Sequence, residues 1–209
     1  MFDQSFFHLL SIIGADLLFS VLLTALAAVY VPIYCVLRKA ADLKQSALKF
    51  AGLKAGLCIC VNFFVVSFGT DNLFVPFIII LCLIADIDLF IRKIPTEFLI
   101  ILIALTILSV RDISGVILLK TIIPTLCFCG LWFLVRRFTD MGIYDIFLIM
   151  ILSITLADFR STVKFSALIL ILWGLIGLLF HVNPRYEQIR KIPLAPLIVT
   201  AFILTLRFL

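Results

Sequence analysis

Two aspartates, Asp88 and Asp145, occupy matched positions in apolar stretches of the chain, and their chemistry is the first feature to explain. Asp88 lies three residues before an apolar run ends at Ile91, and Asp145 lies four residues after another run begins at Met141. In helices that rise about 1.5 Å per residue, both acids would lie about one turn inside the same side of a membrane. Burying a carboxylate in hydrocarbon costs several kcal/mol, so an acid inside a span is by default a candidate functional residue.

The chemistry expected of such a pair is that of an aspartic peptidase. Two carboxylates within a few Å of each other cannot both ionise, so the pair would share one proton. The ionised member would take a proton from water as general base, and the protonated member would polarise a peptide carbonyl. Because a coupled pair titrates as a unit, the sequence does not assign base and acid to individual residues.

A structural interpretation competes with the catalytic one. Asp86 and Asp88 would lie at the headgroup level and pair with Arg92 and Lys93, since charged residues often flank the ends of spans. Asp86 is two residues from Asp88 and would face another side of a helix, so it is a poor candidate for the pair and is expected at most to tune the local charge.

Three other polar residues in apolar runs receive structural interpretations. Asp16 is expected to be a lone interhelical or water-contacting acid, because no partner motif surrounds it. His8 and His181 would lie near opposite faces of the membrane, and neither has a cluster of ligands beside it. The sequence therefore predicts no metal site and no cofactor.

Composition places these residues in a membrane protein. The chain of 209 residues is 65% hydrophobic and 14% charged, with a mean hydropathy of +1.31, which leaves too little polar surface for a soluble globule. The six cysteines lie in or beside apolar runs and are expected to be buried thiols. The net charge of +5 arises from Lys and Arg in short gaps between apolar runs, a pattern that orients spans and does not indicate a nucleic-acid partner.

The apolar runs predict an all-α, polytopic helical bundle that forms a single domain over residues 1–209. The eight predicted spans cover residues 6–37, 55–69, 73–91, 97–110, 115–135, 141–157, 165–182 and 194–206. Basic segments at residues 38–54, 92–93, 136–137 and 185–191 hold 12 of the 17 Lys and Arg residues and would all face one side. That bias predicts that these segments are cytoplasmic and that the amino terminus is outside.

Three short motifs resemble the type IV prepilin leader peptidases. Asp88, followed seven residues later by Pro95 of an Ile-Pro pair, matches the first-aspartate motif of that family. Gly142-Ile-Tyr-Asp145 is similar to its second motif, Gly-x-Gly-Asp, which also opens a sixth span. Ile192-Pro-Leu-Ala-Pro196 is similar to the Ile-Pro-Phe-Gly-Pro stretch that opens the last span of the family. The resemblance covers residues 73–209 and extends to the eight-span topology.

The resemblance implies that Asp88 and Asp145 are the catalytic pair. The supporting positions of its motifs are Pro95, Gly142, Tyr144, Pro193 and Pro196. Tyr144 stands in place of the second glycine of Gly-x-Gly-Asp and would either narrow the approach of a substrate or offer a hydroxyl to Asp145. Phe147 stands where the family usually has lysine, and the chain lacks the paired Cys-x-x-Cys motifs of members that also methylate.

The sequence thus predicts a short, peptidase-only enzyme that cleaves the basic leader of prepilins or pseudopilins at the cytoplasmic face of a lipid bilayer. Two alternatives from other classes stay open. A small proton-coupled transporter would also carry acids in its spans, although it would place them near the midplane in broken helices. A non-catalytic assembly subunit of a pilus or secretion system would explain Tyr144 and Phe147.

Overall fold

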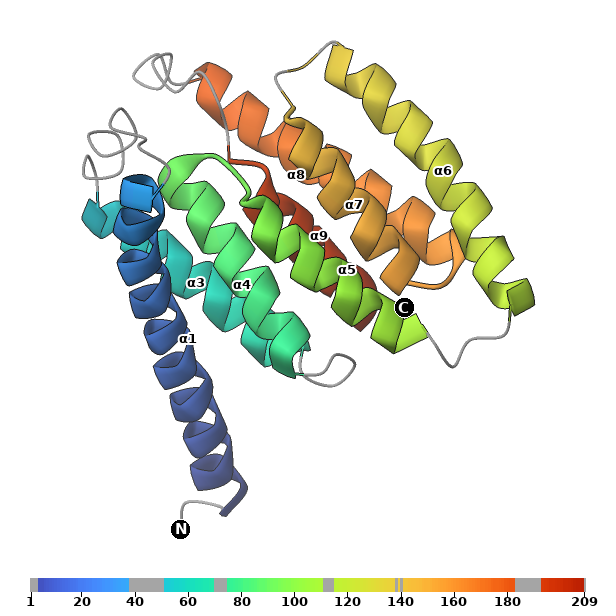
Figure 1. The fold of residues 1–209 in the computed structure, drawn as a ribbon. Helices are drawn as coiled ribbons and strands as arrows, with labels where there is room; N and C mark the ends of the chain where they lie inside the picture. The colour runs from blue at the N-terminus through green and yellow to red at the C-terminus, as the bar shows by residue number, and fades with distance from the viewer. Residues whose placement is uncertain are drawn as a thin grey trace. The chain divides into compact units, whose positions relative to one another are not determined.

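The computed structural model describes residues 4–37, 51–69, 75–110, 115–137, 139, 141–182 and 193–208 (Figure 1). These residues are almost entirely helical and contain no strand, which confirms the all-α prediction. The basic segments at residues 38–50 and 185–191, and Ile192 of the third motif, lie outside the described residues.

Eight helices are described, and each coincides with one predicted apolar run. They are α1 (Gln4–Leu37), α3 (Ala51–Gly69), α4 (Val75–Ile91), α5 (Thr96–Val110), α6 (Gly115–Arg137), α7 (Ile143–Thr155), α8 (Phe159–Val182) and α9 (Ala195–Arg207). The largest differences lie at helix starts. Two helices begin more than two residues earlier than predicted: α8 begins at Phe159 and not at Phe165, and α3 begins at Ala51 and not at Ala55.

Within the described ranges, three helical segments are long and apolar enough to cross a membrane, namely Ser11–Tyr34, Gly52–Gly69 and Phe159–Leu178. A hydrocarbon core of about 30 Å requires about 20 residues of helix. α5, α7 and α9 have 15, 13 and 13 residues, and the 17 residues of α4 include two aspartates. The structure therefore supports membrane-crossing helices in part of the chain, and the full set of eight spans stays a prediction.

The chain divides into two compact units, Met1–Ile91 and Arg92–Leu209, and each is described by itself. In the first unit, α1 packs against α3 and α4, and α3 packs against α4. The core of this three-helix group contains fully buried side chains from every helix: Ala27, Cys58, Val65, Leu81 and Ile84. That residues 1–209 work together as one peptidase domain concerns function, and it stays a prediction.

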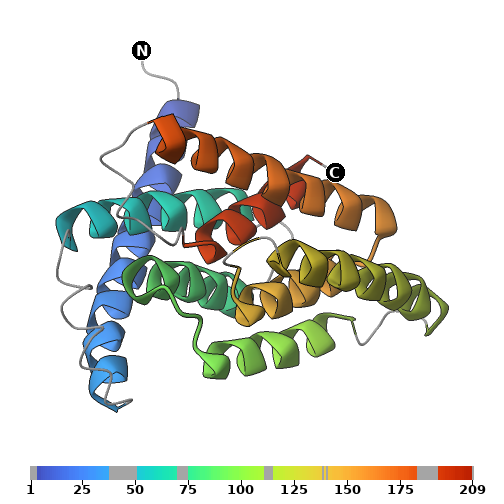
Figure 2. The same cartoon turned by 90° about the horizontal axis from the view of Figure 1, so that it is seen from above.

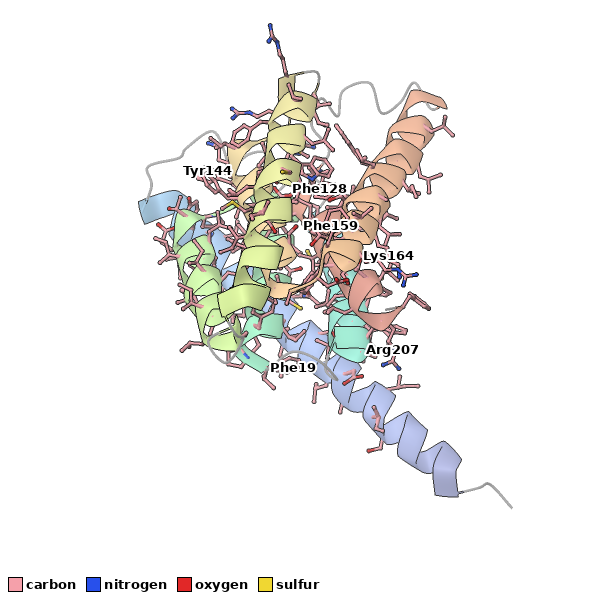
Figure 3. The ribbon with its side chains drawn as sticks, turned by 90° about the vertical axis from the view of Figure 1, so that its right-hand side faces the viewer. Phe19, Phe128, Tyr144, Phe159, Lys164 and Arg207 are labelled. Atoms are coloured by element: carbon pink, nitrogen blue, oxygen red, sulfur yellow. The ribbon has the colours of Figure 1, made fainter. Side chains whose placement is uncertain are left out.

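In the second unit, α7 is the helix that the others share. It packs against α5, α6, α8 and α9, and α8 packs in turn against α6 and α9. Figure 2 shows α9 alongside α8. The rings of Phe165 of α8 and Phe202 of α9 meet edge to face with centroids 5.9 Å apart. Phe128 of α6 and Phe159 of α8 lie 6.2 Å apart between ring centroids (Figure 3).

The early start of α8 has a local cause in Asp158, the residue before the helix. Its Oδ2 atom accepts hydrogen bonds from the backbone N–H of Ser161 at 3.0 Å and from the Ser161 hydroxyl at 2.9 Å. These are the bonds of a helix N-cap, which satisfy donors that the first turn of a helix leaves without partners. The hydrogen bonds from the Ser161 side chain and backbone hold the pKa of the exposed Asp158 carboxyl below its usual value.

We expect Asp158→Ala to lower the free energy of unfolding by about 1 kcal/mol at neutral pH, and Asp158→Asn to lower it less, because an amide oxygen still caps the helix. The folded pKa of Asp158 lies below its unfolded value of about 3.9. The charge-dependent part of the stabilisation is therefore complete above about pH 4 and is lost as the pH falls through the lowered folded pKa. Unfolding in detergent micelles at about pH 7 and about pH 3 measures both effects. An equal loss for Ala at the two pH values would contradict this assignment.

Candidate active site

Asp88 lies in the last turn of α4, three residues before the helix ends at Ile91, as the sequence predicts. Its side chain is 5% exposed. The chain leaves the helix through Arg92, which is exposed and takes a left-handed conformation with φ 57°. Since left-handed φ values end helices, Arg92 fixes the end of α4 within one turn of the carboxylate.

The end of a helix is an unfavourable place for an acid, because the carbonyl groups of the last turn already carry partial negative charge. The positive charge of Lys54 of α3 offsets this partial negative charge. Its Nζ atom donates a hydrogen bond of 3.2 Å to the backbone carbonyl of Phe90, two residues from Asp88. The sequence assigns Lys54 to a basic loop, whereas the structure places it inside α3, which begins at Ala51. A cation thus lies at the end of α4 that carries Asp88.

Asp145 lies in the first turn of α7 and is half-buried. Its Oδ2 atom accepts a hydrogen bond of 2.9 Å from the backbone N–H of Gly142, the residue that precedes the helix. A Cβ atom on residue 142 would lie 2.9 Å from the same oxygen, closer than such contacts occur. Gly142 therefore permits the bond, and the i to i+3 spacing of the second motif has a direct physical explanation. An acid at a helix start is also favoured by the helix dipole.

Tyr144 and Phe147, the two departures from the family pattern, are 42% and 41% exposed. Figure 3 shows Tyr144 on α7. Among the described residues, no hydrogen bond joins its hydroxyl to Asp145, whose described bond comes from the Gly142 backbone. The suggestion that Tyr144 supplies a hydroxyl to the carboxylate is therefore not supported in this conformation.

The supporting prolines lie at the starts of helices in the second unit. Pro95 is buried and directly precedes α5, and Pro196 is buried in the first turn of α9, with Pro193 shortly before it. Proline is favoured there because the first N–H groups of a helix lack partners inside the helix in any case. The local role of these motif residues is to fix where α5 and α9 begin.

Asp88 belongs to the first unit and Asp145 to the second, so the surroundings of each acid are described separately. Each lies within one turn of the end of an apolar helix. Their convergence as a proton-sharing pair stays a prediction.

A buried polar cluster that the sequence interpretation misses lies in the first unit. Asp86 is fully buried, and its Oδ2 atom accepts a hydrogen bond of 2.7 Å from Nδ2 of Asn62 on α3. The same nitrogen donates to Oγ1 of Thr24 on α1 at 3.1 Å. The competing interpretation in which Asp86 pairs with Arg92 or Lys93 is therefore not supported, because the partner of Asp86 is an amide in the core. The signal available in the sequence was that Thr24, Asn62 and Asp86 are polar residues in three separate apolar runs.

Among the residues whose side chains are described, which exclude His8 and His181, no group of three or more His, Cys, Asp or Glu residues could hold a metal ion.

Comparison of the chain with protein-family models, curated proteins and solved structures finds no match.

Proposed function

We propose that the chain is a membrane-embedded aspartic endopeptidase that removes the basic leader from type IV prepilins or pseudopilins. Asp88 and Asp145 are its catalytic pair. The observation that carries the proposal is that two aspartates each lie within one turn of the end of an apolar helix. Asp88 lies on a helix whose last turn binds Lys54, and Asp145 is held by Gly142. The motif resemblance supplies the substrate class.

The proposal places these helices in an eight-span bundle in the inner membrane, with the amino terminus outside and the basic segments in the cytoplasm. The bias of Lys and Arg toward one set of gaps supports this orientation. A substrate leader that is short and basic stays in the cytoplasm while the apolar segment behind it inserts. Its cleavage junction then lies at the depth proposed for the two aspartates, which water reaches more easily than the bilayer centre.

In the proposed reaction, water adds to the peptide carbonyl carbon at the leader junction. The ionised carboxylate takes a proton from that water, and the protonated carboxyl donates its proton to the carbonyl oxygen. Collapse of the resulting diol breaks the C–N bond, and the amine leaves with a proton from the pair. Gly142 orients Asp145 by binding Oδ2, which leaves Oδ1 for the shared proton.

Co-expression with a prepilin that carries a basic leader tests the proposal. We expect the prepilin to gain electrophoretic mobility as its leader is lost, and the new amino terminus to lie at the junction between the leader and the apolar segment. A prepilin whose leader junction is blocked by substitution is the matched substrate control. Prepilins and pseudopilins that all stay uncleaved beside abundant, folded protein would contradict the peptidase and favour the non-catalytic assembly subunit.

A further inference from the structure

The three helices of the first unit meet at a continuous chain of buried hydrogen bonds. Thr24, Asn62 and Asp86 are each 5% exposed or less. The Thr24 hydroxyl donates to the backbone carbonyl of Ser20 at 2.9 Å, and Nδ2 of Asn62 donates both to Thr24 Oγ1 at 3.1 Å and to Asp86 Oδ2 at 2.7 Å. The chain therefore runs from α1 through α3 to α4.

The donors in this chain fix the orientation of the Asn62 amide. Thr24 has one hydroxyl proton and gives it to Ser20, so its oxygen can only accept a bond from Asn62. Asn62 must therefore direct its NH₂ group toward Thr24, and the second N–H of that group reaches Asp86. Both amide protons are used, and the amide oxygen of Asn62 is left as an acceptor.

Two acceptor oxygens then have no donor among the described residues, namely Oδ1 of Asn62 and Oδ1 of Asp86. They belong to the two planar groups that the 2.7 Å bond already joins. A buried acceptor without a donor costs about 1–3 kcal/mol, and a buried charge without a partner costs more. Two such oxygens in one bonded pair require an explanation.

No cation among the described neighbours of Asp86 balances a negative charge there. The Cys58 thiol of α3 hydrogen-bonds to Asp86, and the Cys82 thiol of α4 lies near it. A thiol is only a weak donor and carries no positive charge. Lys54 of α3 binds the carbonyl of Phe90, four residues farther along α4. From α1 the cluster receives the hydroxyl group of Thr24, which is bonded to the backbone carbonyl of Ser20, and the other acid on α4 is Asp88.

We propose that Asp86 carries a proton on Oδ1 and donates it to Oδ1 of Asn62, so that the two side chains form a neutral acid–amide pair. One proton removes the charge and gives both oxygens a partner, because the pair then closes as a ring of two antiparallel hydrogen bonds. The pair joins α3 to α4, and Thr24 extends it to α1. This site is independent of the peptidase proposal, since neither Asp88 nor Asp145 takes part in it.

Variants of the full chain in detergent micelles test the pair. Asp86→Asn supplies an N–H where the acid supplies O–H, so its thermal midpoint should stay within about 2 °C of the parent value, whereas Asp86→Leu should lose about 5 °C or more. Asn62→Leu should resemble Asp86→Leu. If Asp86→Asn loses as much as Asp86→Leu, the neutral pair is wrong.

Infrared difference spectra between the parent protein and Asp86→Asn give a second measurement that does not depend on stability. We expect the variant to lose a carbonyl band of a protonated carboxylic acid at neutral pH. Loss of carboxylate bands instead would show an ionised Asp86 and overturn the proposal. Stabilisation of the parent by sodium over choline chloride that disappears in Asp86→Asn would assign the two oxygens to a cation and would likewise overturn it.

Discussion

Asp88→Asn and Asp145→Asn are each expected to reduce leader cleavage by at least about 10³-fold, to the background of the assay. An amide can neither take a proton from water nor share one with its partner, so either substitution removes the function of the whole pair. The double variant should be little worse than either single variant, because residues that act as a unit are not additive. Single-turnover cleavage of a purified prepilin measures all three rates.

Asp145→Asn separates catalysis from helix capping, because it removes the carboxylate and keeps an oxygen that can cap α7. Its amide oxygen can still accept the N–H of Gly142, which the carboxylate binds at 2.9 Å, so the stability of α7 should be retained. Asp145→Ala removes that bond as well and should lose both activity and stability. Asp86→Asn is the matched control on α4 and should keep much of the activity.

Unimpaired cleavage by Asp145→Asn at normal membrane abundance would reject the proposed mechanism. Asp145 would then be an acid that caps α7, and its position in Gly142-Ile-Tyr-Asp145 would be a local structural pattern. Loss in Asp145→Asn together with full activity in Asp88→Asn would reject the pair and leave a different partner to be found.

Phe165→Ala and Phe202→Ala are each expected to lower the free energy of unfolding by about 3–5 kcal/mol, because each leaves a cavity between α8 and α9. Both rings are fully buried, and their planes meet at 76°. The loss comes from missing contacts around the cavity, since apolar surface gains little by leaving lipid. Reversible unfolding in micelles or bilayers measures it.

A double-mutant cycle on these two rings should give a coupling of about 0.5–1.5 kcal/mol, as expected of an edge-to-face aromatic pair. Leu178→Ala is the matched control on α8, where the side chain is 63% exposed and truncation leaves no cavity. A similar loss for Leu178→Ala and Phe165→Ala would show that the packing of α8 against α9 does not limit stability.

Helix positions in this chain are well predicted from the sequence, because apolar runs and the polar gaps between them are local signals. The start of α8 is harder to predict, because Arg160 and Lys164 interrupt the apolar run. The local signal for the true start is the cap formed by Asp158 with Ser161 three residues later. The spacing of Gly142 and Asp145 is likewise local, and the structure explains it by one hydrogen bond.

The surroundings of Asp86 could not be predicted in the same way. Helical periodicity predicts that its side chain and that of Asp88 point in different directions, but it does not show what each side of α4 packs against. Asn62 is 24 residues from Asp86 in the sequence, and Thr24 is 38 residues from Asn62. Only the packing of α1, α3 and α4 brings them together, so an acid that seems peripheral in sequence lies in the core.

The contact between Gly142 and Asp145 bears on which residues positions 142 and 144 can hold. A side chain at position 142 would displace the carboxylate, because a methyl group there would lie 2.9 Å from Oδ2. Position 144 is under no such restriction, since Tyr144 is 42% exposed and lies in the helix. The two positions therefore differ: a residue larger than glycine at 142 requires the Asp145 side chain to move, whereas a large aromatic residue at 144 leaves the aspartate held as it is.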